Sequence, residues 1–168
     1  MTNFKKFGLP LMVVALIAAL FFGLNQKTSA PAVTFTTLQG QKNNMADLRG
    51  KVVLVNFWAT DCPSCVQEMP ELVQTYNAYK AKGFEVIAVA MPYDPPAQVL
   101  NYTTQKKLPF PVMHDGLSEI TQAFVDVKLT PTAYIFDKAG NRVQRTVGTL
   151  DFVKLRATLD ELLVKELG

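Results

Sequence analysis

Two kinds of hydrophobic pattern alternate along most of this chain. Lys51–Trp58 is a continuous apolar run rich in β-branched residues, typical of a strand buried on both faces of a parallel sheet. Phe84–Met91 predicts a second buried strand. Between them, Pro63–Lys82 places apolar side chains at i, i+3 and i+4 spacing and is followed by Gly83, which predicts an amphipathic helix with a glycine stop.

The rest of the pattern predicts shorter elements of both kinds. Helices are expected at 96–107, at 117–125 and from a cap at Asp151 to about Leu167, with a short helical turn at 45–49. Strands are expected at 33–38, 110–113, 132–136 and 142–147, and a turn at 40–44. Strand–helix–strand, then a helix, a hairpin and a last helix predicts an α/β fold. Its central mixed sheet would be flanked by helices, with one parallel strand pair and an antiparallel edge.

The N-terminus carries a different signal. Phe7–Leu24 is 18 residues without a charge, and as a helix it would span roughly 27 Å, close to the thickness of the hydrocarbon core. Lys5 and Lys6 precede it, which favours a cytoplasmic N-terminus and a domain outside the cytoplasm. We therefore predict a transmembrane anchor in residues 1–24, a linker at 25–32 and one folded domain at 33–168.

A cleaved signal peptide is the alternative for the same segment. Its apolar region is usually shorter, about 7–15 residues, and the best cleavage point, after Ala30, is followed by Pro31, which should hinder cleavage. Both interpretations export the domain.

Charge gives no reason to expect a nucleic-acid partner. The chain has 17 basic and 14 acidic residues, and Lys5, Lys6 and Lys27 account for the excess. The predicted domain is therefore neutral, whereas nucleic-acid binding needs a basic surface.

The two cysteines of the chain lie three residues apart, at Cys62 and Cys65. A disulfide between them would close almost no loop, so it would gain little from loop entropy. The cysteine pair must therefore serve a chemical purpose rather than a structural one. Pro63 suits the first helical position, which makes Cys62 the N-cap, where free backbone N–H groups and the helix dipole favour a thiolate.

This placement predicts thiol–disulfide exchange. The Cys62 thiolate, the more exposed sulfur, would attack a substrate disulfide, and the buried Cys65 would resolve the mixed disulfide. Glu68, one turn after Cys65, is a candidate to take and return its proton, although a surface acid near the helix start is the plainer interpretation. Asn56 is a polar residue inside a buried strand; it can form hydrogen bonds near the site but cannot titrate. No cofactor beyond the cysteine pair is expected.

Other uses of the C-x-x-C spacing fit less well. A structural zinc site needs more ligands than Cys62, Cys65 and His114 supply, and a c-type haem needs a histidine directly after the second cysteine, where Val66 stands. A copper carrier built from the two cysteines and His114 stays open, because thiolates suit cuprous ion. His114 is otherwise expected as a loop or strand-end residue, and no metal site is predicted.

The segment from Val55 to Pro70 resembles the active site of the TlpA/ResA-like thioredoxins of the redoxin group, which are exported and often membrane-anchored thiol–disulfide oxidoreductases of bacteria. The resemblance covers about residues 33–165 and implies a thioredoxin-like fold. It implies a cis proline at Pro131, with the Thr130 backbone pairing with substrate, and a functional acid at Glu68. It also places Trp58 in the supporting structure of the groove.

The chain departs from this family at three positions beside the cysteines. Asp61 stands where the family usually has Trp, and its carboxylate should oppose thiolate formation on Cys62. The dipeptide Pro63-Ser64 between the cysteines is also uncommon. These differences bear on redox potential and partner rather than on fold.

The resemblance implies a reductase of exported protein disulfides, with apocytochrome c or another redox protein as substrate. The expected location is the bacterial inner membrane, with the catalytic domain in the periplasm or outside the cytoplasm. A membrane electron donor of the thiol-reducing type would then regenerate the cysteine pair. An oxidase or isomerase on the same fold is the alternative.

Overall fold

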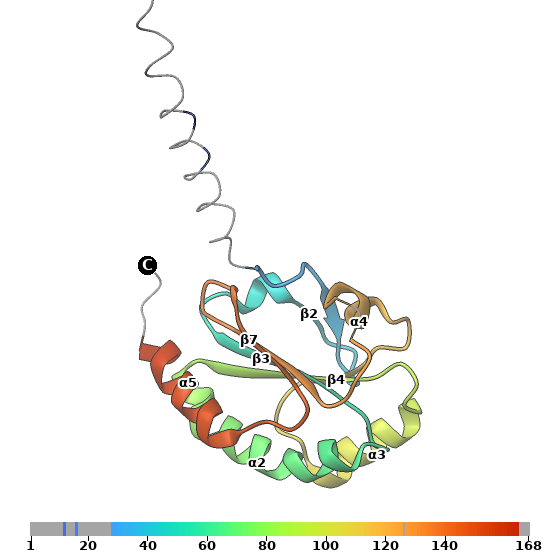
Figure 1. The fold of residues 1–168 in the computed structure, drawn as a ribbon. Coiled ribbons are helices and arrows are strands. Elements are labelled where there is room, and N and C mark those ends of the chain that lie inside the picture. The colour runs from blue at the N-terminus through green and yellow to red at the C-terminus, as the bar shows by residue number, and fades with distance from the viewer. Residues whose placement is uncertain (1–11, 13–15, 17–27, 126, 165–168) are drawn as a thin grey trace, which may run out of the picture.

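A five-stranded mixed sheet forms the centre of the molecule (Figure 1). The computed structural model describes Met12, Leu16 and residues 28–125 and 127–164. The strands run in the order β5-β4-β3-β6-β7. Their bounds are Val52–Trp58 for β3, Phe84–Ala90 for β4, Val112–His114 for β5, Thr132–Phe136 for β6 and Arg142–Val147 for β7. The predicted α/β class with a mixed sheet is confirmed.

The register of the sheet brings three loops to one edge. β3 and β4 are parallel and connected through α2, Pro63–Tyr79, and Trp58 at the end of β3 pairs with Ala90 at the end of β4. β6 is antiparallel to β3, so that its first residue, Thr132, pairs with Phe57. The loops that follow β3 and β4 therefore begin beside the point where the loop that precedes β6 ends. The predicted parallel pair and antiparallel edge are both present.

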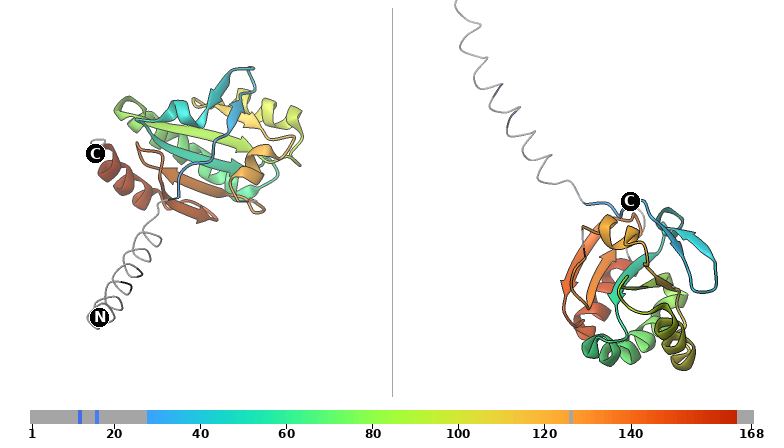
Figure 2. Two further views of the ribbon diagram at one scale, coloured as in Figure 1. Left: turned by 90° about the horizontal axis from the view of Figure 1, so that it is seen from above. Right: turned by 90° about the vertical axis from the view of Figure 1, so that its right-hand side faces the viewer.

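Helices cover both faces of the sheet, as the views of Figure 2 also show. On one face lie α2, α3 (Pro96–Lys106) and α5 (Phe152–Val164). On the other lie the hairpin of β1 (Thr34–Thr36) and β2 (Lys42–Asn44), the 3-10 helix η1 (Met45–Leu48) and α4 (Glu119–Ala123).

Side-chain alternation along β3 divides the core in two. Leu54 and Trp58 pack with Leu72 of α2, whereas Val55 and Phe57 pack on the other face of the sheet. All seven residues of β3 are buried, which explains why its sequence is a continuous apolar run rather than an alternating one. Side chains pack against both faces of β3, so the last residues of this strand have fixed positions.

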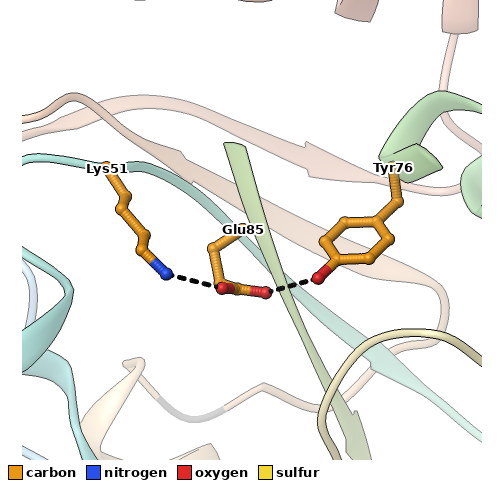
Figure 3. A network of polar contacts seen from close by, with 3 residues as sticks. All are labelled: Lys51, Tyr76 and Glu85. Atoms are coloured by element: carbon orange, nitrogen blue, oxygen red, sulfur yellow. Dashed lines mark hydrogen bonds and ion pairs between the residues drawn. The ribbon is translucent and has the colours of Figure 1, made fainter. Parts of the chain in front are cut away.

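A polar network ties α2 to the start of the sheet, away from the loops described above (Figure 3). Glu85 of β4 accepts a hydrogen bond from the Tyr76 hydroxyl at 3.1 Å and pairs with the Lys51 ammonium at 2.9 Å. Burial and the neighbouring Glu85 carboxylate raise the pKa of Tyr76 to about 12. Tyr76 therefore stays a neutral donor at any physiological pH.

Several predicted elements have other bounds in the structure: β1 and α4 are shorter than predicted, and β5 lies at Val112–His114 rather than 110–113. Two more differ in type. Residues 40–44, expected as a turn, include the strand β2, because Lys42–Asn44 pairs with β1. The helix expected over 63–82 ends at Tyr79 and continues as the 3-10 turn Lys80–Lys82, which Gly83 terminates at φ 98°.

The predicted anchor at 7–24 lies outside the described residues, apart from Met12 and Leu16. Within the described part of the chain, no helix has the length and apolarity to cross a membrane. Residues 28–30, within the predicted linker, are bound to the β6–β7 turn. Ser29 forms an isolated β-bridge with Asn141, and Arg142 donates its backbone N–H to the Thr28 carbonyl at 2.8 Å.

Candidate active site

The end of β3 and the start of α2 place the cysteine pair. After Trp58 the chain turns, and Cys62 adopts an extended conformation (φ −97°, ψ 104°) as the N-cap of α2, with Pro63 in the first turn. The backbone N–H of Cys65 donates to Cys62 Sγ at 3.3 Å. The Cα atoms of the two cysteines are 5.3 Å apart and their sulfurs form a disulfide. The predicted N-cap position of Cys62 is confirmed.

The two sulfurs differ in their access to solvent. Cys62 is half-buried, whereas Cys65 has no exposed surface. A substrate sulfur can therefore approach only Cys62 directly. This asymmetry is the one expected of an attacking and a resolving cysteine.

The side chains that flank Cys62 have opposite effects on its thiolate. The Ser64 hydroxyl lies 3.5 Å from Cys62 Sγ, close enough to donate to it. Asp61, on the other side, is exposed and brings a negative charge to the neighbouring residue. A hydrogen-bond donor stabilises a thiolate and a carboxylate opposes it. The uncommon residues at 61 and 64 thus act in opposite directions on the reactive sulfur.

Glu68 is a buried carboxylic acid one turn beyond Cys65. Its side chain is 6% exposed, and Oε2 accepts the backbone N–H of Leu150 at 3.0 Å, while Oε1 has no partner. Burial raises the pKa of Glu68, and the Leu150 N–H only partly offsets this effect. The nearby Asn56 amide also lowers the pKa, although the two side chains do not meet the geometry of a hydrogen bond. Glu68 is therefore not a surface acid, and its raised pKa lets it hold a proton at a higher pH than an ordinary carboxyl group does.

Asn56 and Trp58 lie beneath the site on the α2 face of β3. Both are completely buried, and neither the Asn56 amide nor the Trp58 indole N–H has a hydrogen-bond partner. The Trp58 ring packs against Tyr102 of α3, with ring centroids 5.2 Å apart. Unpaired buried polar groups cost stability, and the Asn56 amide lies close enough to the buried acid to lower the pKa of Glu68.

The loop before β6 carries the predicted cis proline. The Thr130–Pro131 peptide bond is cis, and the Pro131 carbonyl accepts the Gly148 N–H at 2.8 Å. Because Thr132 pairs with Phe57 near the end of β3, Pro131 lies at the same end of the sheet as the loop that carries the cysteines. The prediction that the Thr130–Pro131 bond is cis is confirmed.

His114 does not join the cysteines. It is the last residue of β5, and its Nε2 lies 2.7 Å from the Asp94 carbonyl oxygen. Among the described residues, no group of three His, Cys, Asp or Glu side chains is arranged to hold a metal ion. The copper-carrier hypothesis therefore gains no support from the geometry.

Sequence reasoning missed the part played by Asp94. This residue is 1% exposed, and its carboxylate accepts hydrogen bonds from the Thr60 backbone N–H at 2.6 Å and from the Thr60 hydroxyl at 2.5 Å. It therefore connects the β4–α3 loop to the loop that carries Cys62. No local signal distinguishes Asp94 from a surface acid, because its partner lies 34 positions away in the chain.

Comparison with known proteins agrees with this geometry. The family model Redoxin matches residues 25–159. Thiol-disulfide oxidoreductase ResA of Bacillus cereus is 35% identical over 133 residues, covering 79% of this chain and 76% of that protein. ResA of Geobacillus kaustophilus is 34% identical over 123 residues, covering 73% and 70%.

Solved structures show the same fold. A thioredoxin-like protein from Neisseria meningitidis superimposes with a TM-score of 0.75 at 42% identity, covering 82% of this chain and 91% of that one. A thiol:disulfide interchange protein from Chlorobium tepidum gives 0.75 at 29% identity, covering 82% and 97%. Because the family match spans most of the chain and these relatives share its thioredoxin-like fold, this chain belongs to the Redoxin family, among its ResA-type thiol–disulfide oxidoreductases.

Proposed function

We propose that the protein reduces disulfides of exported proteins through Cys62 and Cys65. The observation that carries this proposal is the combination of one accessible sulfur at a helix N-terminus with a fully buried second sulfur and a buried acid, Glu68, one turn away. This arrangement supplies an attacking group, a resolving group and a place for one proton. Apocytochrome c or another redox protein is the substrate class we favour.

The cycle moves two electrons from the cysteine pair to the substrate. The Cys62 thiolate attacks one substrate sulfur, the substrate S–S bond breaks, and a substrate thiolate leaves. Glu68 takes the proton of the Cys65 thiol, and the Cys65 thiolate attacks Cys62 Sγ. The Cys62–Cys65 disulfide forms, the second substrate thiolate leaves, and the two substrate thiolates gain protons from Glu68 and solvent.

The acidic residues at the site support the reducing direction. Strong oxidants of this fold stabilise the attacking thiolate, and their potentials lie near about −120 mV, against about −270 mV for thioredoxin. Asp61 directly precedes Cys62, and Glu68 follows Cys65 by one helical turn. A negative charge on either carboxylate opposes negative charge on the nearby sulfur. The dithiol form is thereby less favoured, which makes it the better electron donor.

Equilibration with glutathione redox buffers tests the direction. We expect a potential closer to that of thioredoxin than to that of the strong oxidants, together with reduction of insulin that Cys62→Ser abolishes. The variant Cys65→Ser should accumulate a mixed disulfide through Cys62, which identifies the substrate by mass spectrometry. A potential at the oxidising end of this range would refute the reductase proposal.

We also propose that residues 7–24 hold the domain at the outer face of the bacterial inner membrane, where a thiol-reducing membrane protein regenerates the dithiol. The 18 uncharged residues after Lys5 and Lys6 support this location. Membrane fractionation of the full chain, followed by protease treatment of spheroplasts, tests it. Recovery of the domain in the soluble fraction would contradict a retained anchor.

A further inference from the structure

The loop between β4 and α3 contacts both the loop that carries Cys62 and the loop that carries the cis proline. It leaves β4 where Met91 donates its backbone N–H to the Trp58 carbonyl at 3.0 Å. Asp94 of this loop holds Thr60, two residues before Cys62. The preceding residue of the loop, Tyr93, reaches Thr130 beside the cis proline, with its hydroxyl 3.4 Å from Thr130 Oγ.

Tyr93 is a solvent-exposed aromatic side chain at this end of the sheet. Its surface is 56% exposed, so its ring adds little to the core. Leu129, which precedes Thr130 in the chain, is 64% exposed. Tyrosine and leucine in such a place leave apolar area that a partner can cover.

The backbone on which Tyr93 stands is fixed before any partner arrives. The Asp94 carboxylate is anchored by two hydrogen bonds from Thr60, and the Asp94 carbonyl lies 2.7 Å from His114 Nε2. Pro92 and Pro95 restrict the backbone on either side of this pair. A side chain on a fixed backbone loses less conformational entropy on binding than one on a mobile loop, because only its own rotation has to be restricted.

The neighbouring backbone points to the kind of partner. Within the described part of the chain, the hydroxyl contact with Tyr93 is the one hydrogen bond that Thr130 forms. Its N–H and C=O are thus left for an extended chain, which pairs through its own backbone and places alternate side chains on the surface beside it.

We propose that Tyr93 is a specificity-determining residue whose ring, continued by Leu129, covers an apolar side chain next to the reactive cysteine of an extended polypeptide substrate. The inference rests on the proposed function, because it names the substrate class of the same site. Asp61, at the position before Cys62, offers a charge and no apolar surface, so Tyr93 and Leu129 supply the apolar contact of this edge.

Two matched peptides with one disulfide each test the proposal. They differ in the residue beside the cysteine, which is Leu in one and Ser in the other, and hydroxyethyl disulfide serves as a substrate without flanking residues. We expect the wild-type protein to prefer the Leu peptide in kcat/KM by about tenfold, and Tyr93→Ala to lose this preference. Tyr93→Phe should keep it, because the ring remains. The rate with hydroxyethyl disulfide should be equal in all three proteins.

Leu100→Ala is the matched control, since Leu100 is an exposed side chain of α3, 48% accessible. It should behave as wild type with all three substrates. An unchanged preference in Tyr93→Ala, or no preference in the wild type, would overturn the inference. So would an equal loss with hydroxyethyl disulfide, because Tyr93 would then act on the sulfur chemistry.

Failure of the proposed function gives a different result. If the wild-type dithiol reduced none of the three disulfides and the disulfide form oxidised the reduced peptides instead, the reductase proposal would be wrong. The Leu-over-Ser preference and its loss in Tyr93→Ala would then be measured in the oxidising direction, where the same two results support or overturn the inference.

Discussion

Replacing Glu68 by Gln should make the protein more stable and less active at once. The side chain is 6% exposed, with Oε2 bonded to the Leu150 N–H at 3.0 Å and Oε1 unpaired. Glutamine has nearly the same shape and keeps an oxygen for Leu150, but it carries no charge to desolvate. The substitution therefore removes an electrostatic cost while conserving packing.

The stability gain has a defined pH dependence. Burial raises the pKa of Glu68 above its ordinary value of 4.5, so the folded protein retains a proton that the unfolded chain has released. Stability of the wild type then falls as pH rises from 4.5 through the folded-state pKa, and the loss persists above it. Each unit of pKa elevation corresponds to about 1.4 kcal/mol. The glutamine variant lacks this loss, so its advantage should be absent at pH 4 and largest at pH 8.

Urea unfolding of both oxidised proteins at pH 4, 6 and 8 measures the free-energy difference. Insulin reduction in the same pH range measures activity, which should fall by about a hundredfold, the lower end of what general acid–base catalysis contributes. The pH dependence of the residual activity should also lose the limb that Glu68 produces.

Two results would refute this reasoning. A variant less stable than wild type at pH 8 would mean that the charged form of Glu68 is favoured by its surroundings, against the effect of burial. Wild-type activity in Glu68→Gln would remove the proton-transfer role, even if stability rose as expected.

Three further substitutions probe other parts of the structure. Asp61→Asn removes the charge beside Cys62 and should raise the rate of alkylation of the reduced protein by iodoacetamide at pH 7, measured against wild type; a slower rate would contradict the electrostatic argument. Phe57→Ala deletes a ring with no exposed surface, and chemical denaturation should show a loss of about 3–5 kcal/mol. Tyr76→Phe removes the 3.1 Å hydrogen bond to Glu85 and should cost about 1 kcal/mol; absorbance at alkaline pH should also lose the tyrosine that titrates near 12.

Elements with a strong periodic signal were predictable from the sequence. The bounds of β6 and β7 agree with prediction at both ends, because a buried run and an alternating run are separated by the turn 137–141. Cys62 was predictable as the N-cap because Pro63 can begin a helix but rarely continues one.

Elements fixed by distant contacts were not predictable. β2 is made of Lys42, Asn43 and Asn44, which have weak strand propensity, and it forms because β1 lies beside it. α4 is shorter than expected: the buried Asp115 carboxylate accepts the N–H groups of Ile120 and Thr121, which fixes where it starts.

The site shows the same division. The cysteines, Glu68 and the cis proline follow from local sequence and from the family resemblance. The contact between Asp94 and Thr60 depends on how β3 and β4 pair, so it emerges only when the sheet is assembled.

The attachment of residues 28–30 to the β6–β7 turn determines which end of the domain faces a surface or fusion partner joined ahead of these residues. That turn follows the last residue of β6, Phe136, whereas the cis proline precedes the first, Thr132. At about 3.3 Å per residue the two ends of β6 are separated by roughly 15 Å. A surface, resin or fusion partner joined ahead of Thr28 therefore meets the far end of the domain, and the reactive sulfur stays open to large folded substrates.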